Sequence, residues 1–476
     1  MASAESDKHT EILDIIEKRL IPDEAAKKAR GEVFTPLNLV REMLYGLRKS
    51  DPTQIWGMRD GALFDYDPED RIGGIPLDVW QNPESKWLDP ANGIGNFPFV
   101  AFLMLDFQLS KTMKDAATRK KHIVEKMLYM IEIDKGNVNT ARKIFETLVP
   151  GAKSNICCAD TLKLKKEDLM REFGVAEFDV VMGNPPFQDN ISMNGTLWDK
   201  FIIYSFTVLK PSGFLVFVHP SGWRNVDGKF KHIQKELLSR NIQYLEIHNE
   251  KDGIKTFKSE TRYDWYVLKN LKYTGKTIIY GQDRAFHNID ISGFEFIPNE
   301  KFETIAALLA RDGDEHVNVI QSQSAYEIRK KWMSKKETSV FKFPCIYTVN
   351  SKDQPSLRWS STNEKGHFGI PKLIWSNGRI TSVGSFIDKE GEYGLTQFSY
   401  AIADDPKQLG DLKTAFDSSS FRSLMEACAV GQLSINFRVL KTFKKDFYKE
   451  FLPKKSVSKK RQRTFTKARR SRQRAR

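Results

Sequence analysis

Cysteine is scarce in this sequence, and no long apolar run is present. Only four cysteines occur in 476 residues; Cys157 and Cys158 are adjacent and the other two stand alone. Because neither a disulfide framework nor a C-x-x-C zinc pattern can be recognised, disulfide-stapled secreted scaffolds and zinc fingers are excluded, and a reducing intracellular setting is expected. The longest apolar run, residues 97–105, contains a proline and has about half the length of a membrane helix. The first 20 residues carry charges where a signal peptide has its apolar stretch, so we expect a protein that is not secreted.

Acidic residues are missing from the C-terminal end. Residues 454–476 carry 12 Lys or Arg and no Asp or Glu, so that 14 − 12 leaves a net charge of +2 for residues 1–453. Such a run repels itself and has almost nothing to bury, so we expect residues 453–476 to form a basic disordered tail. The tail could be a nuclear-import signal or only a solubilising segment, but its composition favours binding to a polyanion.

The rest of the chain has the composition of a folded protein, with 40% apolar and 12% aromatic residues. Residues 8–30 have apolar positions at helical spacing. Thr35 before Pro36 predicts an N-cap and a helix that runs to residue 47. Residues 51–85 are rich in Gly, Asp and Pro and are interpreted as a surface insertion.

From residue 87 onward, short apolar runs alternate with helix-like segments. This alternation predicts βαβ units and a mostly parallel sheet. The predicted strands lie near residues 87–88, 127–133, 155–159, 178–182, 214–218, 244–247 and 265–268. After about residue 280 the rhythm is lost, and a second domain of mixed α and β structure is expected.

A glycine-containing turn, Asp89-Pro90-Ala91-Asn92-Gly93-Ile94-Gly95, follows the first of these strands. A helix is predicted to start after it, near Pro98. Two glycines let the backbone approach a ligand closely, and a helix N-terminus adds positive partial charge. The full G-x-G-x-x-G dinucleotide pattern is absent, and Asp89 suits a cation, such as the amino-acid end of a zwitterionic cofactor, better than a pyrophosphate. An ordinary tight turn would have the same spacing.

Acidic residues also follow the next two predicted strands. Glu132 and Asp134 end one of them, and Asp160 follows the other. Because ligands of parallel sheets bind at the carboxyl ends of the strands, these carboxylates can accept hydrogen bonds from a nucleoside-type cofactor. One acid at a strand end is usually a helix cap, but three of them beside a glycine turn favour a cofactor site.

The segment Asn184-Pro185-Pro186-Phe187 follows a buried strand. Two prolines cannot continue a strand ladder, so they fix the backbone in a rigid bend. The side-chain oxygen of Asn184 and the carbonyl oxygen of Pro185 are two fixed acceptors beside the flat ring of Phe187. This arrangement suits an amino group on a planar ring, and a chance match is on the order of one in a hundred or rarer.

In chain order, these segments resemble the motifs of S-adenosylmethionine-dependent adenine-N6 DNA methyltransferases of restriction–modification systems. The similarity covers about residues 30–270 and is greatest to the kind whose catalytic domain precedes a target-recognition domain. It implies an α/β fold: a Rossmann-like methyltransferase sheet with helices on both faces, followed by a mixed α+β recognition domain. It also implies S-adenosylmethionine as the cofactor, double-stranded DNA as the partner, extrusion of the target base from the duplex, and no metal.

The resemblance assigns a role to each matching residue. The methionine end of the cofactor would be held by Phe34, Thr35, Pro36, Asp89, Ala91, Gly93 and Gly95. Glu132 would bind the ribose, Ile133 would pack on the cofactor adenine, and Asp160 would bond its amino group. Asn184, also beside the cofactor, would hold the target amine with Pro185 and Pro186, while Phe187 stacks on the target base. Weaker matches for pocket residues are Lys200, Phe201, Tyr263, Asp264 and Trp265.

The implied domains are an N-terminal helical segment (1–30), a methyltransferase domain (31–280), a target-recognition domain (281–452) and the tail. In a domain that reads DNA, some basic side chains position phosphates and a few read base edges. For any single residue, a solvated face over buried tryptophans explains the pattern equally well. The candidates are Lys330, Lys331, Trp332, Arg358, Trp359, Lys372, Trp375, Arg379, Lys441, Lys444 and Lys445.

Other interpretations stay open. A protein glutamine or a structural RNA also presents a planar amino group to such a loop, although the large C-terminal half favours a reader of duplex DNA. A non-catalytic DNA-binding modification subunit is disfavoured because both Asn184 and Glu132 are present. Since no nuclease motif is recognised, a restriction endonuclease partner would be a separate chain. Neither the recognition sequence nor the oligomeric state follows from the sequence.

Overall fold

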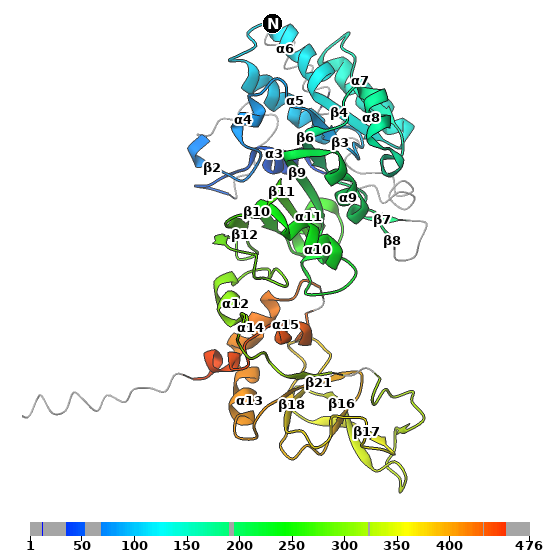
Figure 1. Cartoon of the computed structure of the whole chain (residues 1–476), viewed down its shortest axis with the longest axis vertical. Coiled ribbons are helices and arrows are strands. Elements are labelled where there is room, and N and C mark those ends of the chain that lie inside the picture. Colours follow the sequence, from blue (N-terminus) through cyan, green and yellow to red (C-terminus); the bar gives the residue numbers. More distant parts are fainter. Residues whose placement is uncertain are drawn as a thin grey trace, which may run out of the picture. The chain divides into compact units, whose positions relative to one another are not determined.

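The computed structural model describes most of the chain. The described residues are 12, 35–52, 68–189, 195–321, 324–431 and 433–453. Phe34, the predicted helix over 8–30 apart from Ile12, and the basic tail therefore lie outside them. The chain forms two compact units (Figure 1): Met1–Ala307 with Ala427–Gln432, and Leu308–Glu426 with Leu433–Arg476.

The first unit is built on a nine-stranded sheet with the strand order β13-β12-β10-β11-β9-β6-β3-β4-β5. The strands from β9 to β5 are parallel to one another, whereas β11 runs antiparallel to both of its neighbours. The strands are β3 (Trp87–Asp89), β4 (Leu128–Glu132), β5 (Asn155–Cys158), β6 (Phe178–Gly183), β9 (Leu209–Pro220), β10 (Arg240–Ile247), β11 (Tyr263–Lys272), β12 (Thr277–Tyr280) and β13 (Phe286–Ile289). The predicted Rossmann-like α/β class is confirmed.

Helices alternate with these strands along the chain (Figure 1). They are α3 (Leu37–Tyr45), α4 (Leu77–Trp80), α5 (Asn96–Leu109), α6 (Ala116–His122), α7 (Lys135–Leu148), α8 (Lys166–Phe173), α9 (Trp198–Val208), α10 (Lys231–Leu238) and α11 (Glu250–Phe257). The central helix α5 is apolar around most of its surface, because it contacts β4 and is covered by α3 and α4. Pro98 lies in its first turn, where the missing N–H costs no hydrogen bond.

The predicted start of α3 is wrong. Its first helical residue is Leu37, Pro36 occupies the N-cap position, and no side chain caps the helix. The helix ends at Gly46, whose φ of 101° favours glycine. A Cβ at Gly46 would also lie 2.6 Å from the Ile72 carbonyl oxygen, so the chain segments after α3 and before α4 can approach only because this residue is glycine.

The interpretation of residues 51–85 as a surface insertion is wrong only in part: most of its described residues are exposed or half-buried, but Ile75 and Trp80 belong to the core. Strand β2 (Arg71–Ile72) pairs with β1 (Leu47–Arg48). Trp80 is fully buried, with its ring centroid 4.2 Å from that of Trp87 on β3. The high Gly, Asp and Pro content misled the interpretation because a single buried tryptophan outweighs many polar neighbours in deciding where a segment packs.

The second unit contains two four-stranded sheets, with the strand orders β14-β21-β18-β19 and β15-β17-β16-β20. The strands are β14 (Val319–Ile320), β15 (Met333–Ser334), β16 (Phe343–Val349), β17 (Pro355–Ser360), β18 (Lys372–Ser376), β19 (Ser385–Asp388), β20 (Gly394–Leu395) and β21 (Ser399–Ala403). One helix, α12 (Phe302–Leu308), follows the last strand of the first unit. Three more helices follow the strands of the second unit: α13 (Leu409–Asp417), α14 (Ser419–Ala427) and α15 (Phe437–Lys441). This is the mixed α and β structure that was predicted.

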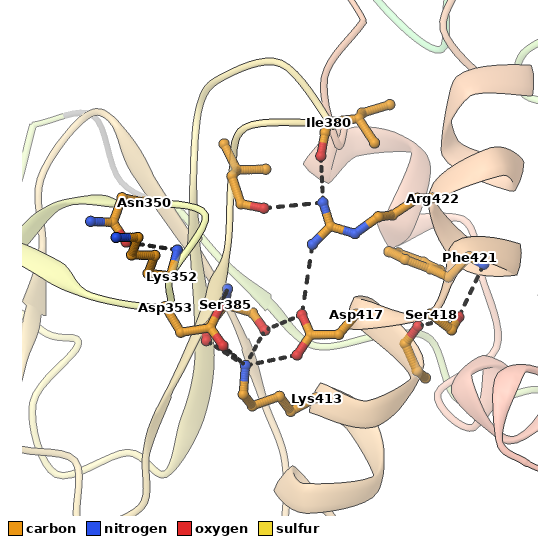
Figure 2. A network of polar contacts seen from close by, with 12 residues as sticks. Asn350, Lys352, Asp353, Ile380, Ser385, Lys413, Asp417, Ser418, Phe421 and Arg422 are labelled. Atoms are coloured by element: carbon orange, nitrogen blue, oxygen red, sulfur yellow. Dashed lines mark hydrogen bonds and ion pairs between the residues drawn. The ribbon is translucent and has the colours of Figure 1, made fainter.

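A polar network fixes the β16–β17 hairpin to the rest of the second unit (Figure 2). Lys413 on α13 donates to Asp353 in the hairpin turn at 2.7 Å, to Asp417 at 2.8 Å and to the Ser385 carbonyl at 2.9 Å. Asp353 also accepts a hydrogen bond from Ser385 N–H at 3.0 Å. The hairpin is therefore held at its turn by charge-assisted bonds as well as by strand pairing.

Within the described residues, no helix is long and apolar enough to cross a membrane.

Candidate functional site

Polar residues follow four parallel strands that end at one edge of the nine-stranded sheet. In the order β6-β3-β4-β5, strand β3 ends at Asp89, β4 at Glu132 and β6 at Gly183, directly before Asn184. Asp160 lies two residues after the end of β5. Because the carboxyl ends of parallel strands share an edge, the fold brings these residues, which are distant in sequence, to one side of the sheet.

Glu132 holds the glycine turn of β3 against the end of β4. Its Oε2 accepts a hydrogen bond from Gly93 N–H at 2.8 Å, and its Oε1 accepts one from Asp134 N–H at 2.8 Å. In the same place, Asn92 N–H donates to the Ile131 carbonyl oxygen at 3.0 Å. The Glu132 side chain is buried, so these bonds form at low dielectric, where they are strong.

The glycine turn leads directly into α5. Gly93 and Gly95 have φ values of 55° and 100°, which strongly favour glycine. Thr35 is joined to this turn, because Asn96 Nδ2 donates to the Thr35 carbonyl oxygen at 2.8 Å. The buried oxygens Thr35 Oγ1, Asn92 Oδ1 and Asn96 Oδ1 find no hydrogen-bond partner among the described residues. A ligand with several N–H donors would satisfy such acceptors, which are otherwise costly to bury.

Asp89 is a carboxyl group enclosed by the protein. It is 1% exposed, and its Oδ1 accepts a hydrogen bond from Ala91 N–H at 3.0 Å. Burial raises the pKa of Asp89 well above its ordinary value, and the neighbouring Glu132 raises it further. Gly183 at the end of β6 leaves room for it, since a Cβ there would lie 2.8 Å from Asp89 Oδ1. A cation at this point would favour the ionised form of Asp89.

Asp160 caps the 3₁₀ turn that follows β5. Its Oδ1 accepts a hydrogen bond from Leu162 N–H at 3.2 Å, and its Oδ2 lies 3.1 Å from Lys163 Nζ. Thr161 Oγ1 donates to the Pro90 carbonyl oxygen, which ties this turn to the glycine turn. Asp160 thus has the structural role of a cap, while its side chain stays one-third exposed and can accept further bonds.

Ile133 is exposed although it is large and apolar. It follows Glu132 directly and has 64% of its side-chain surface accessible. An isolated exposed isoleucine needs no special explanation. Its position between the turns of Glu132 and Asp160 nevertheless offers an apolar surface to a flat ring at the edge of the sheet.

The Asn-Pro-Pro-Phe segment leaves β6 at the same edge. Pro185 is buried, whereas Asn184, Pro186 and Phe187 are half-buried. The ring of Phe187 meets that of Phe257 edge to face, with centroids 6.2 Å apart. Phe187 is therefore positioned by a neighbouring ring and keeps part of its surface accessible.

The weaker sequence matches have mainly structural positions. Asp264 Oδ2 accepts hydrogen bonds from Trp223 Nε1 at 2.9 Å and from Arg224 Nε at 2.8 Å, and all three side chains are buried. Trp265 is also fully buried, while Lys200 is exposed. Trp223 and Trp265 therefore pack in the core. Among the described residues, no group of three or more His, Cys, Asp or Glu side chains could hold a metal ion.

Sequence reasoning missed several residues of this edge. Thr161 and Asn96 connect the turns described above, and Glu246 and His248 lie at the carboxyl end of β10, farther along the same sheet. His248 could have been proposed as a site residue from the sequence, because it directly follows a predicted strand. Asn96 gave no signal, because its contact joins segments 61 residues apart.

The first unit is a Rossmann-like α/β domain with polar turns at one edge of its sheet. Residues 112–257 match the family model described as Eco57I restriction-modification methylase. The matched part includes Glu132, Asp160 and the 184–187 loop, and it begins after the glycine turn.

Two curated relatives extend the similarity beyond this region. An "uncharacterized adenine-specific methylase" of Mycoplasma pneumoniae is 26% identical over 320 residues, which cover 52% of this chain and 69% of the relative. The "Type II restriction enzyme and methyltransferase RM.Eco57I" of Escherichia coli is 23% identical over 394 residues, covering 66% of this chain but 34% of the relative. These matches confirm the predicted resemblance to adenine-specific methylases of restriction–modification systems.

Solved structures of restriction–modification enzymes are also similar. A nuclease-deletion mutant of the Type ISP enzyme LlaGI, in complex with a DNA substrate mimic, superposes with a TM-score of 0.46 at 12% identity. The similarity covers 88% of this chain and 46% of that chain.

Gly183→Ala tests the close approach of β6 to Asp89. The new methyl group would push the Asp89 carboxylate away from Ala91, so we expect S-adenosylmethionine binding to weaken by roughly tenfold, a change of about 1.4 kcal/mol. Titration calorimetry measures the affinity and urea unfolding the stability. Gly174→Ala is the control, because Gly174 also has a positive φ (70°) but no atom near its missing Cβ. Equal affinities of the two variants would contradict the role given to Gly183.

Proposed function

We propose that this protein is a site-specific DNA methyltransferase that moves a methyl group from S-adenosylmethionine to N6 of an adenine extruded from the duplex. The observation that carries the proposal is the common edge of β6 and β3. One strand leads into a diproline loop with two fixed acceptors and an aromatic ring, and the other leads into a glycine turn clamped by Glu132. The similarity of residues 112–257 to restriction-modification methylases supports it.

The residues at this edge fit S-adenosylmethionine. Asp89 and the buried acceptors at the glycine turn suit the cationic amino-acid end, and Glu132 at the end of β4 suits the ribose hydroxyls. The exposed Ile133 and the one-third exposed Asp160 suit the face and the amino group of the cofactor adenine. When bound, the cofactor supplies an activated sulfonium methyl group.

Asn184 and Pro185 would activate the target amine. A purine amine is a poor nucleophile because its lone pair is delocalised into the ring. Acceptors fixed by the diproline bend would bind its hydrogens, draw the nitrogen toward tetrahedral geometry and stabilise the positive charge that develops. Catalysis then depends on holding N6 about 3–3.5 Å from the methyl carbon.

Phe187 would receive the extruded base. A base within a duplex cannot reach this loop, so it must leave the stack at a cost of a few kcal/mol. Stacking on the accessible part of the Phe187 ring, worth about 1–3 kcal/mol per base, offsets part of that cost. Phe257 contacts this ring edge to face and helps to position it.

Asp89→Asn tests the cofactor site. Burial and Glu132 raise the pKa of Asp89, so this carboxyl holds its proton more tightly without ligand; a bound cation should favour the ionised form and release the proton. Affinity should therefore decrease as the pH falls. Calorimetry in buffers of different ionisation enthalpy should detect proton release with the wild type and not with Asp89→Asn, whose affinity should fall about tenfold or more. Proton release that persists in the variant would contradict the assignment.

Asn184→Ala tests the target site. The variant should bind S-adenosylmethionine almost normally, while methyl transfer should slow by about a hundredfold or more, because a preorganised polar contact is lost. Tritiated methyl transfer followed by nucleoside analysis measures this rate and identifies the product. Offered DNA, RNA and protein in parallel, the wild type should label N6-methyladenine in DNA. Label in RNA or in glutamine would favour the alternatives, and no label would favour a non-catalytic subunit.

A basic segment of the second unit is the candidate DNA-binding surface. Residues 329–365 carry 9 Lys or Arg and 3 Asp or Glu, a net charge of +6, whereas residues 366–453 carry 11 and 10, a net charge of +1. The basic segment includes β15, β16 and β17, whose hairpin turn Lys413 holds in place. A rigid, positively charged strand pair suits the backbone and grooves of duplex DNA.

Several cations of the basic segment lie over aromatic rings. The Arg358 guanidinium is 4.1 Å from the Tyr347 ring centroid, and Lys365 Nζ is 4.3 Å from that of Trp332. Stacking orients Arg358, whose Nη1 donates to the Leu357 carbonyl oxygen at 2.8 Å, and leaves Nη2 for a base edge or a phosphate. By contrast, the candidates Lys372 and Trp375 are buried, with Lys372 paired to Asp388, so they belong to the core.

The triple variant Lys331→Ala/Lys335→Ala/Lys336→Ala tests this surface. All three side chains are exposed. We expect weaker binding to duplex DNA and a decrease of the salt slope by up to about 0.9 per lost phosphate contact. Fluorescence anisotropy at several salt concentrations measures both. The control Lys389→Ala/Lys407→Ala removes exposed lysines of the same unit outside the basic segment. If both variants bind DNA equally well, the surface lies elsewhere.

A further inference from the structure

A buried charged cluster lies at the carboxyl end of β10, and the mechanism above does not use it. His248 is 7% exposed, and its Nε2 lies 2.9 Å from Glu246 Oε1. Its Nδ1 lies 3.5 Å from Asp252 Oδ2 on α11. Glu246 also accepts a hydrogen bond from Tyr244 OH at 2.9 Å, and Asp252 from Arg284 at 2.7 Å. The cluster thus surrounds one imidazole with two carboxylates that have their own donors.

The imidazole is the first ring in a series of aromatic contacts that leads to the proposed target site. His248 stacks on Tyr263, with centroids 4.2 Å apart and an interplanar angle of 9°. Tyr263 meets Phe257 edge to face at 4.9 Å, and Phe257 meets Phe187 edge to face at 6.2 Å. His248, Tyr263 and Phe257 are all buried, so the series forms a continuous packed path to the half-buried Phe187.

We propose that His248 is a positioning residue for the target base: its charged ring fixes Tyr263, and through Phe257 it sets the orientation of Phe187. The inference rests on the proposed role of Phe187 in stacking. His248 touches no reacting atom, so it acts only through this ring series.

The charge of the imidazole follows from its neighbours. Burial lowers the pKa of His248, but the contacts with Asp252 and Glu246 outweigh burial and raise the pKa to about 9. On the other elements packed here, Glu42 of α3 has its pKa raised to about 8 by burial and by Glu246, and Asp264 of β11 also has a raised pKa because of burial. A cationic ring stacked on a tyrosine gains a cation–π attraction that a neutral ring lacks.

The raised pKa of His248 determines how its stacking on Tyr263 depends on pH. The cation–π interaction between the two rings is fully present below the ordinary histidine pKa of 6.5, and it is lost as the pH rises through about 9. Loss of the proton would leave Glu246 buried beside a neutral ring and would weaken the stack on Tyr263. The rate of methyl transfer should therefore decrease as the pH rises through about 9 (an alkaline limb of the pH profile), whereas the affinity for the cofactor should not.

His248→Gln removes the charge and keeps a polar side chain. The matched control is His287→Gln, since His287 also contacts two carboxylates, Asp283 at 2.9 Å and Glu303 at 3.3 Å, but lies outside the ring series. For His248→Gln we expect kcat to fall by about ten- to a hundredfold, because a small misplacement of reacting groups has this effect. S-adenosylmethionine affinity should stay unchanged, and the alkaline limb should disappear. The control should keep the wild-type rate and limb.

Phe257→Leu is the second variant, in case His248→Gln does not fold. It interrupts the ring series without changing a charge. We expect the same decrease of kcat with the alkaline limb weakened and S-adenosylmethionine affinity unchanged. Wild-type turnover in Phe257→Leu, or turnover of His248→Gln equal to that of His287→Gln, would overturn the proposal.

Hydrogen exchange separates this inference from the proposed function, since it needs no reaction. The backbone amides of Asn184, Phe187, Gln188 and Asp189 should exchange faster in His248→Gln than in His287→Gln at pH 7. If the wild type methylates no DNA but this difference is found, the proposed function fails and the positioning role stands. If the wild type methylates DNA and the difference is absent, the positioning role fails alone.

Discussion

The bond network around Glu132 is the interaction on which the rest of the site depends. Both of its carboxylate oxygens bind backbone N–H groups, one in the glycine turn after β3 and one in the turn after β4. Buried charge-assisted bonds of this kind are strong, and losing one partner would leave an uncompensated charge in the interior. The side chain that we propose as the cofactor's ribose ligand therefore also holds together the two turns. This double role explains how short turns can be rigid without any disulfide or metal among the described residues.

Buried ionisable groups are concentrated at the same edge of the sheet. Asp89, Glu132, Glu246, His248 and Asp264 are all buried there, and each makes at least one polar or ionic contact. Ion pairs such as Arg224–Asp264 contribute little net stability, because desolvation offsets their attraction, but they are costly to break. An edge of this kind is well suited to hold aromatic and polar groups in one arrangement, which is what the proposed methyl transfer requires.

The basic segment of the second unit concentrates positive charges that are exposed to solvent. Repulsion between these charges opposes folding. Stacking of Arg358 on Tyr347 and of Lys365 on Trp332 holds individual cations on aromatic rings, while Lys413 anchors the hairpin turn. Not every cation of the second unit lies on an aromatic ring or anchors the hairpin. Lys372, which has the same chemistry, is buried against Asp388 and stabilises the core, so residue type alone does not distinguish a DNA contact from a structural ion pair.

The sequence by itself determined the α/β class, the approximate strands, the glycine turn and the diproline loop, because these depend on local patterns of apolar, glycine and proline residues. It also placed Asp89, Glu132, Asp160 and Asn184 at strand ends, from which a common edge follows if the strands are parallel. It did not determine that α3 starts at Leu37, that Trp80 is buried against Trp87, or that Lys372 is buried. Only the tertiary structure decided these points, and it alone joined His248 to Phe187 through Tyr263 and Phe257. The physical reason is that burial and stacking depend on segments far apart in the chain, whose proximity no local pattern encodes.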